Sequence, residues 1–221
     1  MLFLALASLV APEIAEAQTP GPPPDDDNQV WHETQVFIAL DEKKRTDLVL
    51  LQYARFGWNE GFRRDLRSGA GVRYNINKYW SVQPTYVYQY AEQSDGRKSY
   101  SHRLFVDNSV RIPFSKFSLP NRVRVERLVR HSRPDAWNFR FRPGIDVPVT
   151  IGGEKMTLFA NTEVFYDTGP KAWTRNRVMA GVSKKFNDVF TCDFFYLHQN
   201  DGFGTTSDVQ AFGTILKVRL R

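Results

Sequence analysis

Polar and apolar side chains alternate along most of the chain, and the alternation is clearest between Arg122 and Arg142. In the first arm of this stretch, from 122 to 130, valines share one side while arginines and Glu126 share the other. In the second arm, from 137 to 142, Trp137 and two phenylalanines alternate with asparagine and arginine. Because successive side chains of a β-strand point to opposite faces, the stretch predicts two strands, each with one charged and one apolar face.

Alternating segments of about nine to fourteen residues follow one another to the end of the chain, and none has the 3.6-residue period of a helix. The predicted strands span residues 30–40, 47–56, 66–76, 80–90, 100–112, 122–130, 137–142, 155–167, 174–186, 189–199 and 212–220. Pro84 is unfavourable inside a sheet because proline donates no backbone hydrogen bond. Since single-chain bacterial barrels have an even number of strands, we expect ten if 30–40 is not a full strand, or twelve if one more exists.

The connections favour a transmembrane barrel. Short turns at Asn77-Lys78 and Asn187-Asp188 alternate with longer polar loops near 92–99, 131–136, 168–173 and 200–207, and tyrosine and tryptophan gather toward strand ends. Both features are typical of up-and-down antiparallel barrels in the outer membrane. A soluble β-sandwich, with the apolar face as its core, is the alternative. Between residues 67 and 73, glycines share a face with arginines, and this combination suits the crowded interior of a barrel better than the open surface of a sandwich. Arg127 lies on the apolar face, which fits a barrel only near an interface.

The N-terminus indicates export. An apolar run from Leu2 to Val10, followed by Ala15-Glu16-Ala17, predicts a signal peptide at residues 1–17, with a buried N-terminal helix as the alternative. Residues 18–28 are rich in proline and aspartate and predict a disordered leader, which leaves 29–221 for the barrel. The lone Cys192 cannot form an internal disulfide. Export of a barrel predicts the outer membrane of a Gram-negative-type envelope.

The charged residues predict a network inside the barrel. The chain has 30 basic and 24 acidic residues. Its arginines occupy alternate strand positions among carboxylates, an arrangement that does not favour nucleic-acid binding. Charged groups inside a barrel need partners of opposite charge. The predicted lumen network comprises Arg73, Arg103, Asp107, Arg111, Arg122, Arg124, Glu126, Arg140, Arg142, Glu163, Arg175 and Arg177.

Several short motifs occur in a characteristic order: Trp31-x-Glu33, Arg122-x-Arg124-x-Glu126-Arg127, Phe139-Arg140-Phe141-Arg142, Glu163-x-Phe165 and Asn176-Arg177. In this order the chain resembles an uncharacterised bacterial family of exported proteins of unknown function. Members of that family are predicted to form outer-membrane β-barrels. The resemblance extends from about residue 29 onward and implies the barrel fold, but it implies no activity and no catalytic residues.

These features predict a structural or transport role of porin-like type, with passage or binding of small anionic solutes in the lumen. At ten to twelve strands, side chains can fill the lumen, so an open pore and a plugged barrel both remain possible. The expected partners are outer-membrane lipid, lipopolysaccharide and the outer-membrane insertion machinery. We expect no nucleic acid, no cofactor and no metal site.

Two other functions remain as alternatives, a lipid-modifying enzyme of the outer membrane and a soluble periplasmic binding protein. Ser101 and His102 are adjacent in a strand and point to opposite faces, so they cannot act as a dyad. His198, beside Asn200 and Asp201, is the better candidate for surface chemistry. The sequence contains no glycine-framed serine and no HExxH motif, and on that ground we expect no enzymatic activity.

Overall fold

The computed structural model describes residues 27–220 apart from 44, 58–62, 93–95, 132–133 and 203–207. The described residues form eleven β-strands. Their bounds are β1 Asp27–Ala39, β2 Thr46–Gly57, β3 Arg63–Asn75, β4 Trp80–Glu92, β5 Lys98–Pro113, β6 Ser118–Arg130, β7 Ala136–Ile151, β8 Glu154–Asp167, β9 Ala172–Lys185, β10 Phe190–Asn200 and β11 Val209–Leu220. The predicted signal peptide and all but the last two residues of the predicted leader lie outside the described residues.

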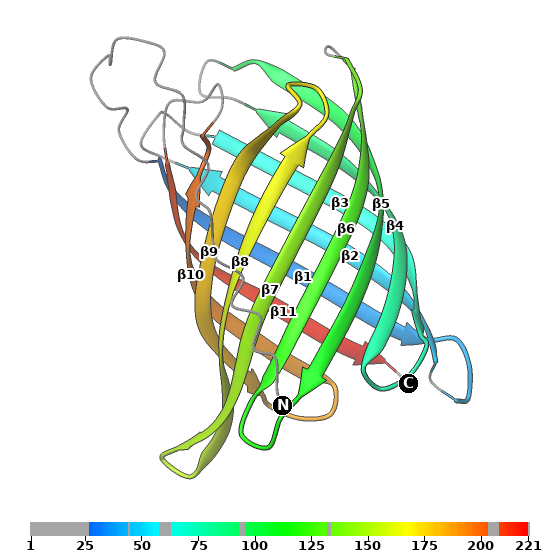
Figure 1. Cartoon of the computed structure of the whole chain (residues 1–221), viewed down its shortest axis with the longest axis vertical. Helices are drawn as coiled ribbons and strands as arrows, with labels where there is room; N and C mark the ends of the chain where they lie inside the picture. The colour runs from blue at the N-terminus through cyan, green and yellow to red at the C-terminus, as the bar shows by residue number, and fades with distance from the viewer. Residues whose placement is uncertain are drawn as a thin grey trace, which may run out of the picture.

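The strands close into one barrel (Figure 1). Each strand pairs antiparallel with the next, and β1 closes the ring by pairing parallel with β11. The prediction of an all-β, up-and-down barrel is therefore confirmed, and a two-sheet sandwich is excluded. The expectation of an even number of strands is wrong for the described part of the chain. The predicted strand 30–40 is complete, and with an odd number of strands the first and the last run in the same direction.

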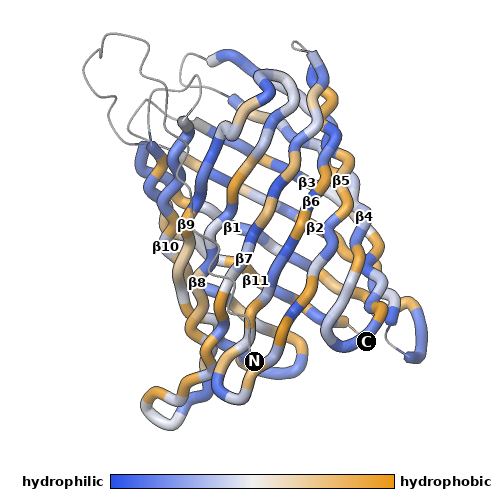
Figure 2. Tube along the Cα trace, in the orientation of Figure 1, coloured by the Kyte–Doolittle hydropathy of each residue, from blue (hydrophilic) through white to orange (hydrophobic). Residues whose placement is uncertain are grey.

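Alternation along each strand sets the two faces of the wall, and Figure 2 shows it as changing colour along the tube. On β6, Val123 and Val125 are exposed on the outside, whereas Arg124 and Glu126 are buried inside. On β7, the outward Phe139 is exposed in the same way. The apolar faces predicted for the 122–142 hairpin therefore form part of the outer wall, and its charged faces point to the lumen.

Prolines interrupt pairing without ending strands. Between β3 and β4, Gly71 pairs with Thr85 and pairing resumes at Tyr74 with Val82, so the gap lies beside Pro84. The sequence analysis ended the seventh strand at 142, but β7 runs on to Ile151 and contains two prolines. This prediction was wrong, because the pairing of β7 with β8 resumes beyond Pro143 and continues to Ile151.

The connections separate the two ends of the barrel. One end has short turns, including Phe114–Phe117 between β5 and β6 and the glycine pair 152–153 between β7 and β8. Gly152 and Gly153 have φ values of 59° and 83°, a conformation that glycine adopts at little cost. The connections 58–62, 93–97, 131–135, 168–171 and 201–208 lie at the other end, which we call the loop end, and 201–208 is the longest connection between two strands. Within the described residues, no helix is long and apolar enough to cross a membrane.

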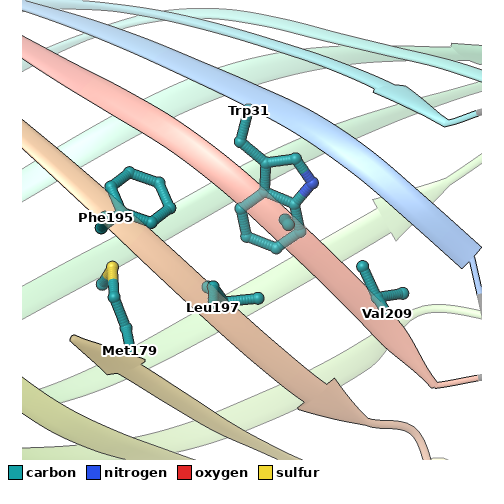
Figure 3. Packing of buried hydrophobic residues seen from close by; sticks show 6 residues of the cluster. Trp31, Met179, Phe195, Leu197 and Val209 are labelled. Atoms are coloured by element: carbon teal, nitrogen blue, oxygen red, sulfur yellow. The ribbon is translucent and has the colours of Figure 1, made fainter. Parts of the chain in front are cut away.

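Large apolar side chains occupy part of the interior. One cluster joins β1, β9, β10 and β11, and Figure 3 shows Trp31, Phe195 and Leu197 among its members. A second cluster around Phe37 and Val49 joins β1, β2, β4 and β5. Members of both clusters also line the space that stays open in the lumen, among them Trp31, Val49 and Leu197.

Candidate functional site

A cavity of about 510 Å³ occupies the lumen. All residues of the predicted network except Arg175 line it, together with Arg55, Arg67 and Lys217. Arg175 donates to Asp201 at the loop end instead, with Nη2 3.0 Å from Oδ2. The alternation of β5 to β9 brings the network residues together, because every second side chain on each of these strands points inward.

Glu163 on β8 is the centre of the network, and its side chain is 2% exposed. Arg140 on β7 donates two hydrogen bonds to it, with Nε 3.0 Å from Oε1 and Nη2 2.9 Å from Oε2. Arg122 on β6 also donates to Oε1, and Arg177 on β9 lies 3.4 Å from Oε2. One carboxylate thus holds three guanidinium groups from three strands.

Two further carboxylates extend the network toward β5. Asp107 accepts two hydrogen bonds of 2.7 Å from Arg124, the bidentate geometry that suits a guanidinium group. Glu126 accepts a hydrogen bond of 2.8 Å from Arg103, and Arg140 lies 3.7 Å from its other oxygen. Buried charges are tolerated when they are paired and hydrogen-bonded in this way.

The positive charges outnumber the negative ones. Six arginines face this part of the cavity, at 103, 122, 124, 140, 142 and 177, against three carboxylates at 107, 126 and 163. Arg142 lies beside Arg122 in the register of β6 and β7. Among the described residues, no carboxylate oxygen comes within the 4.0 Å of an ion pair to Arg142, and none accepts a hydrogen bond from it. The centre of the lumen therefore carries an excess of positive charge.

The sequence analysis missed part of the network at the loop end. Asp65 on β3 accepts two hydrogen bonds from Arg67, and Arg55 on β2 lies 4.0 Å from it. The guanidinium of Arg55 also lies 3.8 Å from the centre of the Trp31 ring. Asp65 lies one residue before the predicted third strand, and Arg55 lies inside the second on its inward positions. Extending the alternation by one residue would have found both.

Arg127, which the sequence places on the apolar face, lies on the outer wall near the loop end. Its Nη2 is 2.8 Å from Asp135, and its guanidinium lies 5.4 Å from the centre of the Trp137 ring. This position near the end of β6 agrees with the interface expected for a charged residue on that face.

His32, His102 and His198 lie on the outer wall, and His131 lies in the connection that follows β6. His198 on β10 has Nε2 3.5 Å from Asp208 Oδ2 and Nδ1 2.9 Å from Gln210 Nε2. His102 lies outside beside Tyr86, with Nδ1 2.8 Å from the hydroxyl, while Ser101 points inward and donates to Gln89. Ser101 and His102 are thus on opposite faces. No group of three His, Cys, Asp or Glu side chains in the described residues is placed to hold a metal ion.

The family model for proteins of unknown function DUF2490 matches residues 28–210. The chain belongs to the DUF2490 family. This confirms the resemblance to an uncharacterised family that the motifs implied. A search of the curated proteins gave no match.

Among solved structures, LpxR from Salmonella typhimurium is similar to this DUF2490 chain, with a TM-score of 0.51 and 9% sequence identity. The match covers 77% of this chain and 82% of LpxR. At this identity the likeness concerns the fold, and LpxR is an outer-membrane β-barrel. LpxR is also an enzyme, a lipid A deacylase. The expectation that the chain has no enzymatic activity is therefore corrected, because a barrel similar in fold is an enzyme and the missing motifs do not exclude enzymatic activity.

Proposed function

We propose that this DUF2490 protein is an exported outer-membrane barrel that binds small anionic solutes in its lumen and lets them pass. The observation that carries the proposal is the excess of arginine over carboxylate around the cavity, where no carboxylate of the described residues forms an ion pair with Arg142. A cavity lined by one sign of charge and enclosed by a wall of low dielectric concentrates ions of the opposite sign. An anion in the lumen would offset the charge that the three central carboxylates leave uncompensated.

Three observations support the membrane location. The outer wall exposes large apolar side chains, such as Val125 at 37% and Phe139 at 45%. The shortest connection, 152–153, lies at one end of the barrel and the longest, 201–208, at the loop end, in line with the short turns and longer loops of outer-membrane barrels. The similarity in fold to LpxR agrees with both. Recovery of the protein from the periplasmic fraction without detergent would contradict this part of the proposal.

Conductance of the refolded full chain in a planar lipid bilayer tests the proposal. In a potassium chloride gradient, we expect a reversal potential of the sign that marks anion selectivity. Replacing Arg142 with glutamine should move this potential toward that of an unselective pore, because the variant removes a lumen cation that has no carboxylate of the described residues within 4.0 Å. Lys185→Gln, at an exposed turn, serves as the control and should leave the potential unchanged. Absence of current, or a cation preference, would contradict the passage of anions.

A second function is favoured by the pairing of His198 with Asp208 on the outer wall. A histidine oriented by a carboxylate is the arrangement of a general base, and here it faces the surrounding lipid near the loop end. This arrangement suits hydrolysis of a lipid ester or amide by an outer-membrane enzyme. The test incubates the protein with lipopolysaccharide vesicles and follows released acyl chains by mass spectrometry. We expect His198→Ala to abolish release and His102→Ala to preserve it. Equal release from both variants would contradict the role of His198.

A further inference from the structure

We propose that Arg122, Arg142 and Asn161 form a specific oxyanion site in the lumen, and that the site takes a dianion of the phosphate class. The proposal rests on the proposed binding of anions and names the place and the chemistry. Arg122 and Arg142 are register partners on β6 and β7, and Asn161 on β8 is the register partner of Gly144. All three side chains line the cavity.

The site contains polar atoms that nothing in the described residues satisfies. Arg122 Nε and Asn161 Oδ1 are buried and have no hydrogen-bond partner. Rotating the Asn161 amide by about 180° exchanges its oxygen for its NH₂ group, so this side chain can donate to a ligand. A buried polar group without a partner is destabilising, so a ligand that pairs with it is favoured. An oxyanion between the three side chains would satisfy the guanidinium and amide donors together.

The charge around the site favours a dianion over a monoanion. The central carboxylates are already shared, since Asp107 accepts both of its close hydrogen bonds from Arg124 and Glu163 is held by three arginines. Arg142 has no carboxylate within 4.0 Å in the described structure, and Arg122 beside it shares Glu163 with two other arginines. A phosphate group brings two negative charges and several acceptor oxygens, and guanidinium groups bind such oxygens in bidentate pairs. A carboxylate supplies one charge.

Gly144 provides room beside the site. Its backbone does not have the positive φ that would require glycine, since within the described residues the glycines with positive φ are 96, 152 and 153. A Cβ at this position would lie 3.0 Å from the carbonyl oxygen of Ala160, 3.1 Å from Asn161 Cβ and 3.4 Å from Pro120 Cγ. A side chain here would therefore press against Asn161 and narrow the space next to Arg142. The missing side chain explains why a ligand can reach the Asn161 amide.

Isothermal titration of the refolded full chain in detergent tests the site, with inorganic phosphate, acetate and chloride as the probes. We expect phosphate to bind more tightly than acetate or chloride. Loss of one charge-assisted hydrogen-bonding partner costs about 1.5 to 3 kcal/mol, so Arg142→Gln should weaken phosphate binding roughly 10- to 100-fold. Arg142→Lys, which keeps the charge but not the bidentate geometry, should recover only part of the affinity.

Gly144→Ala separates a defined site from a diffuse field, because it changes no charge. We expect it to weaken phosphate binding while the protein still folds, with some loss of stability in urea unfolding because the added Cβ would lie 3.0 Å from the carbonyl oxygen of Ala160. Arg127→Gln removes an equal charge from the outer wall and should leave binding unchanged. Equal binding of phosphate and acetate, unaffected by Gly144→Ala, would overturn the specific site but leave a general preference for anions. Failure of every anion to bind would overturn both proposals.

Discussion

Between β5 and β8, the inner face of the wall carries Asp107, Glu126 and Glu163, and the outer face carries valines, phenylalanines and leucines. Between β10 and β2, the distribution is partly reversed. The inner face there carries Trp31 and Leu197 with their clusters, and the outer face includes histidine, threonine and glutamine. Strands with the same two-residue alternation therefore contribute opposite kinds of side chain to the lumen. The face of each strand that points into the lumen is therefore set by how the strands close into a ring and not by the polarity of the side chains on that face.

The polar side chains on the outer wall satisfy one another. His32 on β1 has Nδ1 2.7 Å from the hydroxyl of Thr214 and Nε2 2.9 Å from that of Thr34. On the next two strands, the hydroxyl of Ser68 donates to Gln52 at 2.6 Å. In surroundings without water, a polar group needs such a partner. The same principle applies to both regions. Ion pairs stabilise the buried charges of the lumen, and hydrogen bonds between neighbouring side chains stabilise the polar groups of the outer wall.

The strongest test of this comparison removes the carboxylate at the centre of the lumen. Glu163→Gln leaves Arg122, Arg140 and Arg177 without their shared counter-charge, and breaking a buried ion pair costs about 3 to 5 kcal/mol. We expect a loss of stability of this size in urea unfolding of the protein in detergent micelles. Asp188→Asn, which removes an exposed ion pair with Lys185, is the control and should unfold close to the wild type. An equal, small effect of both variants would show that the network does not hold the wall together.

A smaller effect is expected from matched arginine substitutions on the two outer surfaces. On the proposed membrane location, Val125→Arg places a charge against lipid and should cost about 2 to 4 kcal/mol if the residue lies near the bilayer midplane. Gln52→Arg should cost less, because hydroxyl and amide groups already surround this position. Unfolding of both variants in lipid vesicles measures the difference. A larger cost for Gln52→Arg would contradict the distinction between the two outer surfaces.

Local alternation carried most of the information about the strands, including the hairpin from 122 to 142. The prediction failed at the end of the seventh strand and for the number of strands. The predicted seventh strand ended at 142, whereas β7 continues through Pro143 and Pro148 to Ile151, paired with β6 as far as Asp146 and with β8 to its end. The even strand count rested on a general property of bacterial barrels and not on any residue of this chain.

The site was predictable only in part, because its partners come from distant strands. Alternation identified the arginines and carboxylates of β5 to β9 as one face. It could not pair Arg122 with Glu163, which lie 41 residues apart, because the register of two intervening hairpins sets that contact. The same register leaves Arg142 without an ion pair among the described residues, and the sequence alone could not show this. Trp31 and Leu197, in contrast, look like outward residues by polarity alone and became lumen residues through closure.

The parallel seam between β1 and β11 has a consequence for how the barrel forms. Every other pairing joins neighbours in sequence, but the seam joins residues such as His32 and Thr214, which are 182 positions apart. Closing so long a loop carries the largest entropic cost of any pairing in the sheet, and nothing rewards it until the strands between are in place. The first strand to be synthesised is therefore among the last to find its second partner. Until then the nascent sheet has two free edges, each able to pair with another chain.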